Sequence, residues 1–532
     1  LSYAYPNLKG LVLLPIPVAA EVMAEVASMI VPNRDLFAIE ELVNRRMVSF
    51  ENGELTLFMR AERVASGNPE LAAVKVQLRD DKPDSAYTWP IMEATFVMSK
   101  KLEPMPVRSM PHTRPRSVHW SGRDIYPSRI CYGRRLRGIS FVETWSESGL
   151  DYEVEVPPLA GNVVFTRFPI WLVNPLLLEA VVSAFALWRN RDRFSFAFRM
   201  RRLELHAPLP NEGARVKCYL RLTGVTPKSH LCDITVSDGK GGVLMTIAGW
   251  EEIVKYIRPE YHELIMQPAT SFVTKPLSAE TLGNPPADVA AAYVTDVPYA
   301  DFERDDEIWL RTFSCIVLGE KERGQFKAMP GSAARRTEWL FGRIAAKEAV
   351  RRYLKDFHQA RWSDADVEIF ADDAGKPYAI GAWNDYLQLK LDIAIAHTAQ
   401  FVIALAASNA RIGVDVESVS RDLSGEFTAG VFTPEELELA AQAVNPSQSI
   451  IRFWCAKEAV SKALGTGIRY SPKELIVSGY QADASVLTVR LTGAWEDAFR
   501  NLKGRDLPVT FRTMNDHALA FCFIPRTLFN ED

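Results

Sequence analysis

The chain lacks an apolar run long enough to span a membrane, an excess of charge of one sign, and closely spaced cysteines. A membrane helix needs about twenty consecutive apolar residues, so we expect no membrane partner. The net charge of −4, with 24% charged residues, does not indicate nucleic-acid binding. The six cysteines show no C-x-x-C or metal-ligand spacing, which predicts reduced thiols in a cytoplasmic protein. We find no short repeat and no low-complexity tract.

The length of 532 residues exceeds one ordinary hydrophobic core, so we expect roughly two to four domains. Two zones before residue 258 each combine an apolar helix with segments of alternating polarity, which predict antiparallel strands. After a segment rich in proline and small residues, helices alternate with strands up to the end of the chain. Leu1 stands where a start methionine would be, which is typical of a piece of a longer polypeptide.

Two carboxylates share one face of a predicted strand in RIGVDVESV. Alternate side chains of a strand point the same way, so Asp415 and Glu417 lie together while Val414 and Val416 point into a core. Neighbouring carboxylates repel unless a positive charge lies between them, and a divalent cation with oxygen ligands such as Mg²⁺ meets this need. A solvated face of an edge strand is the alternative.

The stretch RFWCAKEAVSKALGTGI predicts a helix that supplies a third acid. Trp454, Glu458 and Lys462 are spaced i, i+4, i+8 and share one side of this helix. Glu458 would complete a metal site, and Lys462, one turn further, suits a phosphate as a point charge. Lys457 lies on a neighbouring face and carries less weight. Ordinary ion pairs on a solvated helix are the alternative.

Further cations upstream predict an anion site for a polyphosphate. Arg343, Lys347 and Arg351 follow one another at i, i+4, i+8 in WLFGRIAAKEAVRRYLK. Lys376 stands in the turn AGKPY, and His397 ends an apolar strand. For the basic stripe a solvated face is the alternative, and for the histidine a structural role.

The ordered set of these motifs resembles the 4′-phosphopantetheinyl transferases of the surfactin-activating type. The set comprises WLFGRIAAKEAVR, GKP, a histidine after an apolar strand, GVDVE, FTPEEL and F-W-x-x-K-E-A-x-x-K, and it covers residues 293–532. The resemblance implies a pseudo-symmetric two-lobed α/β fold with coenzyme A between the lobes. It also implies transfer of phosphopantetheine from coenzyme A to a serine of an acyl carrier protein, with release of 3′,5′-ADP.

The resemblance assigns roles to residues of this chain. It implies Mg²⁺ held by Asp415, Glu417 and Glu458, with Glu458 also activating the serine, directly or through a metal-bound water. Lys462 would stabilise phosphate charge. Further contacts to coenzyme A are expected from the remaining cations: Arg343, Lys347, Lys376 and His397.

The region before residue 258 resembles the double-hotdog dehydratase domains of polyketide and polyunsaturated fatty acid synthases. GLVLLPIPVAAEVMAEVA, DIYPSRICYGRRLRGI and NPLLLEAVVSAFALW carry the resemblance. The family's catalytic His position falls on Pro6, its Asp position on Glu179, and the polar residue one turn later is Ser183. Dehydration needs a base and an acid, and proline is neither. We therefore expect a degenerate dehydratase, with an active dehydratase whose base lies elsewhere as the alternative.

The expected fold class is α+β, a double hotdog followed by a two-lobed transferase, at the end of a large synthase. A purely docking or scaffolding module is the third alternative, and a homodimer through the hotdog region is expected. The predicted boundaries are 1–110 and 111–258 for the two hotdog units, 259–292 for a linker, and 293–400 and 401–532 for the transferase lobes.

Overall fold

The computed structural model divides into two compact units. Unit 1 comprises residues 11–266, and unit 2 comprises residues 267–529 together with residues 6–10. The first hotdog was predicted to begin at residue 1, but Pro6 and its neighbours group with unit 2, where the Asn7 amide donates to Asp366 at 2.9 Å. The structure describes residues 6–50, 53–80, 89–107, 112–130, 132–158, 170–188, 192–283, 285–304, 307–423, 425–481, 483 and 485–529.

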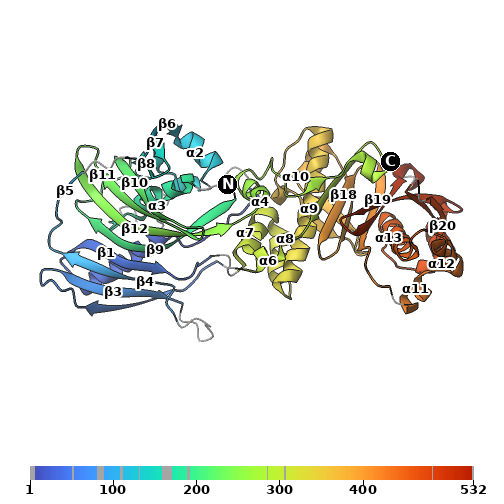
Figure 1. Ribbon diagram of the computed structural model, residues 1–532, viewed down its shortest axis with the longest axis horizontal. Helices are drawn as coiled ribbons and strands as arrows, with labels where there is room; N and C mark the ends of the chain where they lie inside the picture. Colours follow the sequence, from blue (N-terminus) through green and yellow to red (C-terminus); the bar gives the residue numbers. More distant parts are fainter. Residues whose placement is uncertain are drawn as a thin grey trace. The chain divides into compact units, whose positions relative to one another are not determined.

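In the described residues, unit 1 contains one twelve-stranded sheet whose strand pairs are antiparallel (Figure 1). Its order is β2-β3-β4-β1-β9-β12-β11-β10-β8-β7-β6, with β5 paired to β12. The strands are β1 (Asp35–Asn44), β2 (Phe58–Val64), β3 (Ala72–Arg79), β4 (Met92–Ser99), β5 (Met105–Pro106), β6 (Arg116–Ser121), β7 (Ile139–Ser146), β8 (Gly149–Glu155), β9 (Arg193–Leu205), β10 (Arg215–Val225), β11 (Ser229–Ser237) and β12 (Gly242–Tyr256).

Each half of this sheet has its own apolar helix. α1 (Ile16–Ile30) packs against β1 to β4, and α3 (Pro175–Ser183) packs against β8 and against α1. The Glu21 carboxylate on α1 accepts the backbone N–H groups of Leu172 and Val173 at 2.8 and 2.7 Å, just before α3 begins. The predicted double hotdog, two helix-and-sheet halves joined edge to edge, is confirmed. The shorter helices of unit 1 are α2 (Gly122–Ser128) and α4 (Pro259–Met266).

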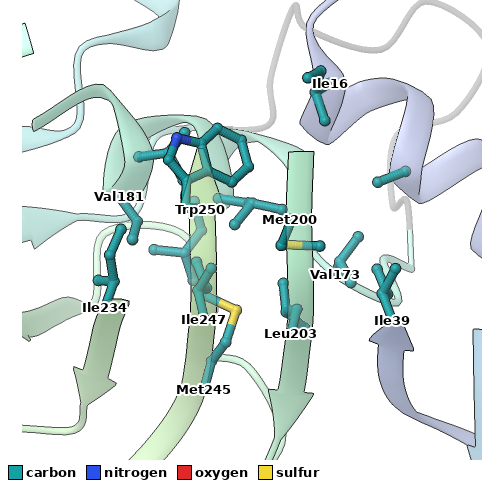
Figure 2. Packing of buried hydrophobic residues seen from close by; sticks show 14 of the residues in the cluster. Ile16, Ile39, Val173, Val181, Met200, Leu203, Ile234, Met245, Ile247 and Trp250 are labelled. Atoms are coloured by element: carbon teal, nitrogen blue, oxygen red, sulfur yellow. The ribbon is translucent and has the colours of Figure 1, made fainter. Parts of the chain in front are cut away.

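One hydrophobic core runs through both halves of unit 1. Figure 2 shows Ile39 of β1 near Met200 and Leu203 of the neighbouring strand β9, with Trp250 of β12 beyond them. Trp250 is 2% exposed, and its indole N–H donates to Glu252 at 3.1 Å, which satisfies its polar group inside the core. Because the core is shared across β1 and β9, the two halves are expected to fold as one body.

Unit 2 consists of two similar lobes, each with a long helix on an antiparallel sheet (Figure 1). In the first lobe, α9 (Ala333–His358) covers the sheet β13-β14-β18-β17. In the second, α13 (Pro446–Leu464) covers the sheet β19-β23-β22-β21-β20. β17 and β18 contact β19, which joins the lobes. The predicted two-lobed fold is confirmed. The strands are β13 (Lys275–Pro276), β14 (Val289–Thr295), β15 (Glu368–Ala371), β16 (Pro377–Ile380), β17 (Asp392–His397), β18 (Phe401–Ala407), β19 (Ala410–Ser418), β20 (Leu475–Gln481), β21 (Val486–Leu491), β22 (Asp506–Met514) and β23 (His517–Pro525).

Shorter helices surround the two sheets of unit 2. They are α5 (Ala279–Leu282), α6 (Tyr299–Glu303), α7 (Ile308–Val317), α8 (Glu320–Ala328), α10 (Ala382–Leu387), α11 (Gly425–Val431), α12 (Pro434–Ala441) and α14 (Gly493–Ala498). In the described part of the chain, no helix is both long and apolar enough to cross a bilayer.

The segment 259–292, expected to be a linker, is built into both units. Its start forms α4 of unit 1, and its next residues are held by α9 of unit 2. Arg351 donates to the carbonyl oxygens of Pro268 and Ser271 at 2.8 and 2.9 Å, and Glu348 accepts the N–H groups of Val273 and Thr274. The prolines suggested a linker, but the buried charges of α9 bind this backbone and order it.

The closest approach between helix and sheet in the second lobe occurs at Gly413. A Cβ atom at this position would lie 1.8 Å from the carbonyl oxygen of Ala459 and 2.7 Å from the amide of Ala463, both on α13. Only glycine lets the backbone of α13 lie directly on β19. Even-numbered residues of β19, such as Val414 and Val416, pack instead into the core shared with the first lobe.

We expect Gly413→Ala to destabilise unit 2 by at least about 2 kcal/mol, because the added methyl group overlaps helix backbone that cannot move without repacking the lobe. Urea unfolding of the full chain measures the effect. Gly430→Ala on α11 is the matched control, since a Cβ there meets nothing within 4 Å. Equal stability of the two variants would contradict this account of the contact.

Candidate functional site

The structure brings three of the predicted acids and one lysine together where α13 lies on β19. Asp415 and Glu417 stand on the face of β19 that also carries Gly413, and Glu458 and Lys462 come from α13. The Lys462 ammonium group lies 2.7 Å from Oδ1 of Asp415. The alternation of the strand and the four-residue spacing of the helix thus place these charges as expected.

A second cation, which the sequence reading missed, also binds this cluster. Arg421, in the turn after β19, forms an ion pair with Glu417. The other oxygen of Asp415, Oδ2, is buried and has no hydrogen-bond partner. A buried carboxylate oxygen without a donor is unfavourable, so this atom lacks the cation or donor that its position calls for.

The acids of the cluster shift one another's protonation. Burial, followed by the charge of Asp415, raises the pKa of Glu458 to about 7. Burial and Asp415 also raise the pKa of Glu417, although Arg421 and a hydrogen bond from Trp454 oppose them. Burial by itself would lower the pKa of Lys462, but Asp415 and Glu458 raise it. The cluster therefore holds more negative charge than its own cations neutralise.

Carboxylate oxygens from a strand and a helix are the donors that Mg²⁺ prefers, and the unpartnered Oδ2 of Asp415 fits such an ion. As the side chains stand, no three His, Cys, Asp or Glu residues in the described ranges converge closely enough to hold a metal. Lys462 and Arg421 bind the carboxylates instead. A divalent cation would have to replace one or both of these partners.

The basic stripe predicted on α9 is not a stripe on the surface. Lys347 is completely buried, forms an ion pair with Glu322 at 2.5 Å and donates to the carbonyl oxygen of Asp364. Arg351 is 2% exposed and is paired with Asp364 at 2.9 Å. The assignment of Lys347 to coenzyme A is therefore wrong, because its charge is used inside the lobe and is not accessible.

The other predicted anion contacts remain at or near the surface. Arg343 is half-buried, its guanidinium lies 4.2 Å from the ring centre of Trp339, and burial lowers its pKa. His397 is about half exposed and lies 2.8 Å from Glu338. Among the described residues, neither Arg343 nor His397 forms a hydrogen bond or ion pair with the carboxylate cluster, so their roles stay predictions.

Lys376 reaches the end of α13. Its ammonium group is 2.7 Å from Asp392 and 3.3 Å from the carbonyl oxygen of Lys462, and burial lowers its pKa. Lys376 also lines a cavity of about 990 Å³ beside Arg411 at the start of β19 and Gly465 after α13. This cavity lies at the opposite end of β19 from Glu417.

Lys457 does not face the cluster. It is fully buried, lies 2.8 Å from Glu436 of α12 and donates to the carbonyl oxygens of Val431 and Pro472. Glu436 was not singled out from the sequence, although the N-terminal box in FTPEEL signals a glutamate that turns back on its own helix start. Lys457 thus binds α13 to α12 and to the neighbouring backbone. Glu458, the next residue, faces the other acids.

The same arrangement occurs in the first lobe and corrects our expectation of no repeat. The stretches AKEAV at 346–350 and at 456–460 occupy equivalent places on α9 and α13. Lys347 pairs with Glu322, and Lys457 pairs with Glu436; each of these glutamates caps its own short helix and accepts one N–H of a following strand. The short repeated motif was the signal for this internal symmetry.

Unit 1 contains one buried acid at the position expected for a catalytic carboxyl. Glu179 on α3 is 8% exposed and accepts a hydrogen bond from the Tyr132 hydroxyl. Burial raises its pKa to about 7, and Glu252 adds to the shift. Ser183, one turn later, donates to the Ala180 carbonyl oxygen of its own helix. No histidine partner of Glu179 is found among the described residues.

Comparisons with known proteins agree with the geometry of unit 2. Residues 411–522 match the family model of the 4′-phosphopantetheinyl transferase superfamily. A holo-[acyl-carrier-protein] synthase of Geobacillus kaustophilus is 36% identical over 94 residues, 18% of this chain and 69% of that protein. An L-aminoadipate-semialdehyde dehydrogenase-phosphopantetheinyl transferase of Schizosaccharomyces pombe is 28% identical over 171 residues, 29% of this chain and 65% of that protein. The family match includes Asp415, Glu417, Glu458 and Lys462.

A solved structure is also similar to this chain. It is a trans-AT polyketide synthase dehydratase domain from Brevibacillus brevis, with a TM-score of 0.37 and 12% sequence identity. The similarity covers 46% of this chain and 88% of that domain.

Because the carboxyl group of Glu179 is buried, we expect the free energy of unfolding to depend on pH. Its pKa of about 7 lies above the ordinary 4.5, so the folded chain keeps a proton that the unfolded chain has lost. Stability therefore falls as the pH rises from about 4.5 to about 7. We expect Glu179→Gln to match the original chain below this range and to be more stable above it by up to about 3 kcal/mol. Urea unfolding of both chains, at one pH below about 4.5 and one above about 7, measures the difference. Glu212→Gln, at an exposed position, is the control. A stability gap that is the same at both pH values would contradict the prediction.

Proposed function

The chain belongs to the 4′-phosphopantetheinyl transferase superfamily, and we propose that it moves phosphopantetheine from coenzyme A to a serine hydroxyl of an acyl carrier protein with Mg²⁺. The observation that carries this proposal is the group of three neighbouring carboxylates, Asp415, Glu417 and Glu458, one oxygen of which, Oδ2 of Asp415, is buried without a hydrogen-bond partner. A shared excess of negative charge at one point of the surface is what a divalent cation stabilises.

Mg²⁺ held by the three carboxylates would neutralise charge that builds on the pyrophosphate of coenzyme A. The residues of the chain do the rest. Glu458, on the side of α13 that faces the other acids, is proposed to accept the proton of the attacking serine. Lys462, on the same side of α13, places a cation next to the phosphates and stabilises the leaving 3′,5′-ADP.

The cavity beside Lys376 is suited to the nucleotide end of coenzyme A. Its volume of about 990 Å³ falls at the upper end of ligand pockets, and its lining carries both charges: Arg411 is one of its cations, and Lys376 is paired with Asp392. Arg411 lies four residues before Asp415 on the same face of β19, about 13 Å along the strand. α13 lies directly on β19 at Gly413, between Arg411 and Asp415, so a ligand that reached from this cavity to the acids would have to pass beside the helix. Arg343 and His397 are proposed as additional phosphate contacts.

The carrier protein would belong to a large synthase, of the polyketide or polyunsaturated fatty acid kind, and the dehydratase-like unit 1 would belong to the same assembly. A homodimer through unit 1 and a cytoplasmic location complete the proposal.

The test is the intact mass of an apo carrier protein after incubation with the chain, coenzyme A and Mg²⁺. We expect a gain of one phosphopantetheine group that EDTA abolishes. Asp415→Ala removes the central ligand and should abolish the gain while circular dichroism shows an intact fold. Asp422→Ala, an exposed acid seven residues further along the chain, is the matched control. Near-normal transfer by Asp415→Ala would remove the metal assignment.

A second candidate function concerns unit 1. The buried Glu179 with its raised pKa and its Tyr132 partner could serve as the acid of a dehydration. In the part of unit 1 that the structure describes, however, no histidine accompanies Glu179 as a base, so we propose that unit 1 is a scaffold or docking surface for the synthase. We expect no loss of water from a 3-hydroxyacyl thioester, followed by mass spectrometry. Dehydration that disappears in Glu179→Gln would overturn the scaffold proposal.

A further inference from the structure

Arg421 is the one cation at the carboxylate cluster that comes from a turn and not from a regular element of the described chain. The turn closes through a hydrogen bond from the Arg421 N–H to the Ser418 carbonyl oxygen at 3.1 Å. Its guanidinium pairs with Glu417, four residues earlier. The Arg421 side chain is 42% exposed and that of Glu417 is 18% exposed, so the pair lies at the mouth of the cluster.

Aromatic residues hold this arginine beside the acid. The guanidinium lies 5.9 Å from the ring centre of Phe427 on α11. Phe427 in turn meets Trp454 of α13 edge to face, with centroids 5.1 Å apart. Trp454 also lies near enough to Glu417 to oppose the rise in the pKa of that acid. The guanidinium of the Arg421–Glu417 ion pair therefore also makes a cation–π contact with the Phe427 ring.

The charge balance of the cluster indicates the role of Arg421. Three carboxylates face two cations, Lys462 and Arg421, which leaves one negative charge when all groups are ionised. The Arg421 guanidinium binds one carboxylate oxygen of Glu417, Oε1, so a metal ion that takes this oxygen must displace it, and a metal ion on the other oxygen is still repelled by its positive charge. An exposed ion pair contributes little stability, so Arg421 can leave Glu417 for solvent more easily than the less exposed Lys462 can leave Asp415.

We propose that Arg421 is a displaceable counter-cation that competes with the divalent cation for Glu417 and thereby sets the affinity of the chain for metal. This inference rests on the proposed metal site. In the metal-free chain, Arg421 limits the repulsion between Glu417 and Asp415. When a divalent cation binds, the arginine leaves the acid and turns outward from its exposed position. Arg421 is thus a positioning residue that acts through Glu417.

The test measures metal affinity without the reaction. Mn²⁺, which shares the oxygen ligands of Mg²⁺, is titrated into the full chain and followed by its electron paramagnetic resonance signal. We expect Arg421→Gln to bind Mn²⁺ about two- to fivefold more tightly, the range that the coupling of an exposed ion pair allows. Arg421→Lys keeps the competing charge and should stay close to the original affinity. Arg490→Gln, which removes an exposed arginine paired with Asp506 on β21 and β22, is the matched control.

The outcomes separate this inference from the proposed function. If Mn²⁺ binds the original chain and Arg421→Gln equally well, the inference is overturned and the metal site stands. If neither the original chain nor any variant binds Mn²⁺, both are overturned. The Mg²⁺ concentration that gives half-maximal transfer should fall in Arg421→Gln but not in Arg490→Gln, and a rise in Arg421→Gln would also count against competition.

Discussion

The contact of α13 with β19 at Gly413 is the constraint on which the chemistry of this chain depends. The helix backbone comes so close that no side chain fits between it and the strand. Acids two and four residues further along the strand therefore meet side chains of the helix across a short gap, as the 2.7 Å distance from Asp415 to Lys462 shows. A bulkier residue at position 413 would lift α13 and separate the two halves of the site.

Buried lysine–glutamate pairs keep the two long helices in place. In each lobe the lysine of AKEAV is fully buried, and its glutamate partner also satisfies backbone donors of a neighbouring helix and strand. Such a pair stabilises only when all its donors and acceptors are satisfied, which is the case for Lys347 and Lys457. The glutamates that follow then differ. Glu348 binds the backbone of residues 273 and 274, whereas Glu458 faces two other acids.

The sequence predicted the parts of the structure that follow from local periodicity. Alternation along the strand placed Asp415 and Glu417 on one face, and the helical spacing brought Glu458 and Lys462 to them. Periodicity could not tell which lysines are buried, because the partners of Lys347 and Lys457 lie 25 and 21 residues away on other helices. Nor could it find Arg421, whose position depends on a turn. The segment 259–292 was misread because its prolines carry no information about the charges of α9 that bind it.

The buried pair of Lys457 and Glu436 has all its hydrogen-bond partners, whereas the cluster of Asp415, Glu417 and Glu458 does not. This difference makes the cluster the place in the second lobe where a cation can bind. Lys457 fixes one face of α13, because its ammonium group donates to three acceptors on other elements. The fixed helix can then hold, on its other face, acids that repel one another. Burial and the neighbouring acids raise the pKa of Glu458 to about 7, and one buried oxygen of Asp415 has no hydrogen-bond donor. Without the fixed helix, these side chains would move apart and relieve the repulsion. A cation that enters the cluster is therefore bound by groups that the fold has already brought together, and little of its binding free energy is lost in ordering them.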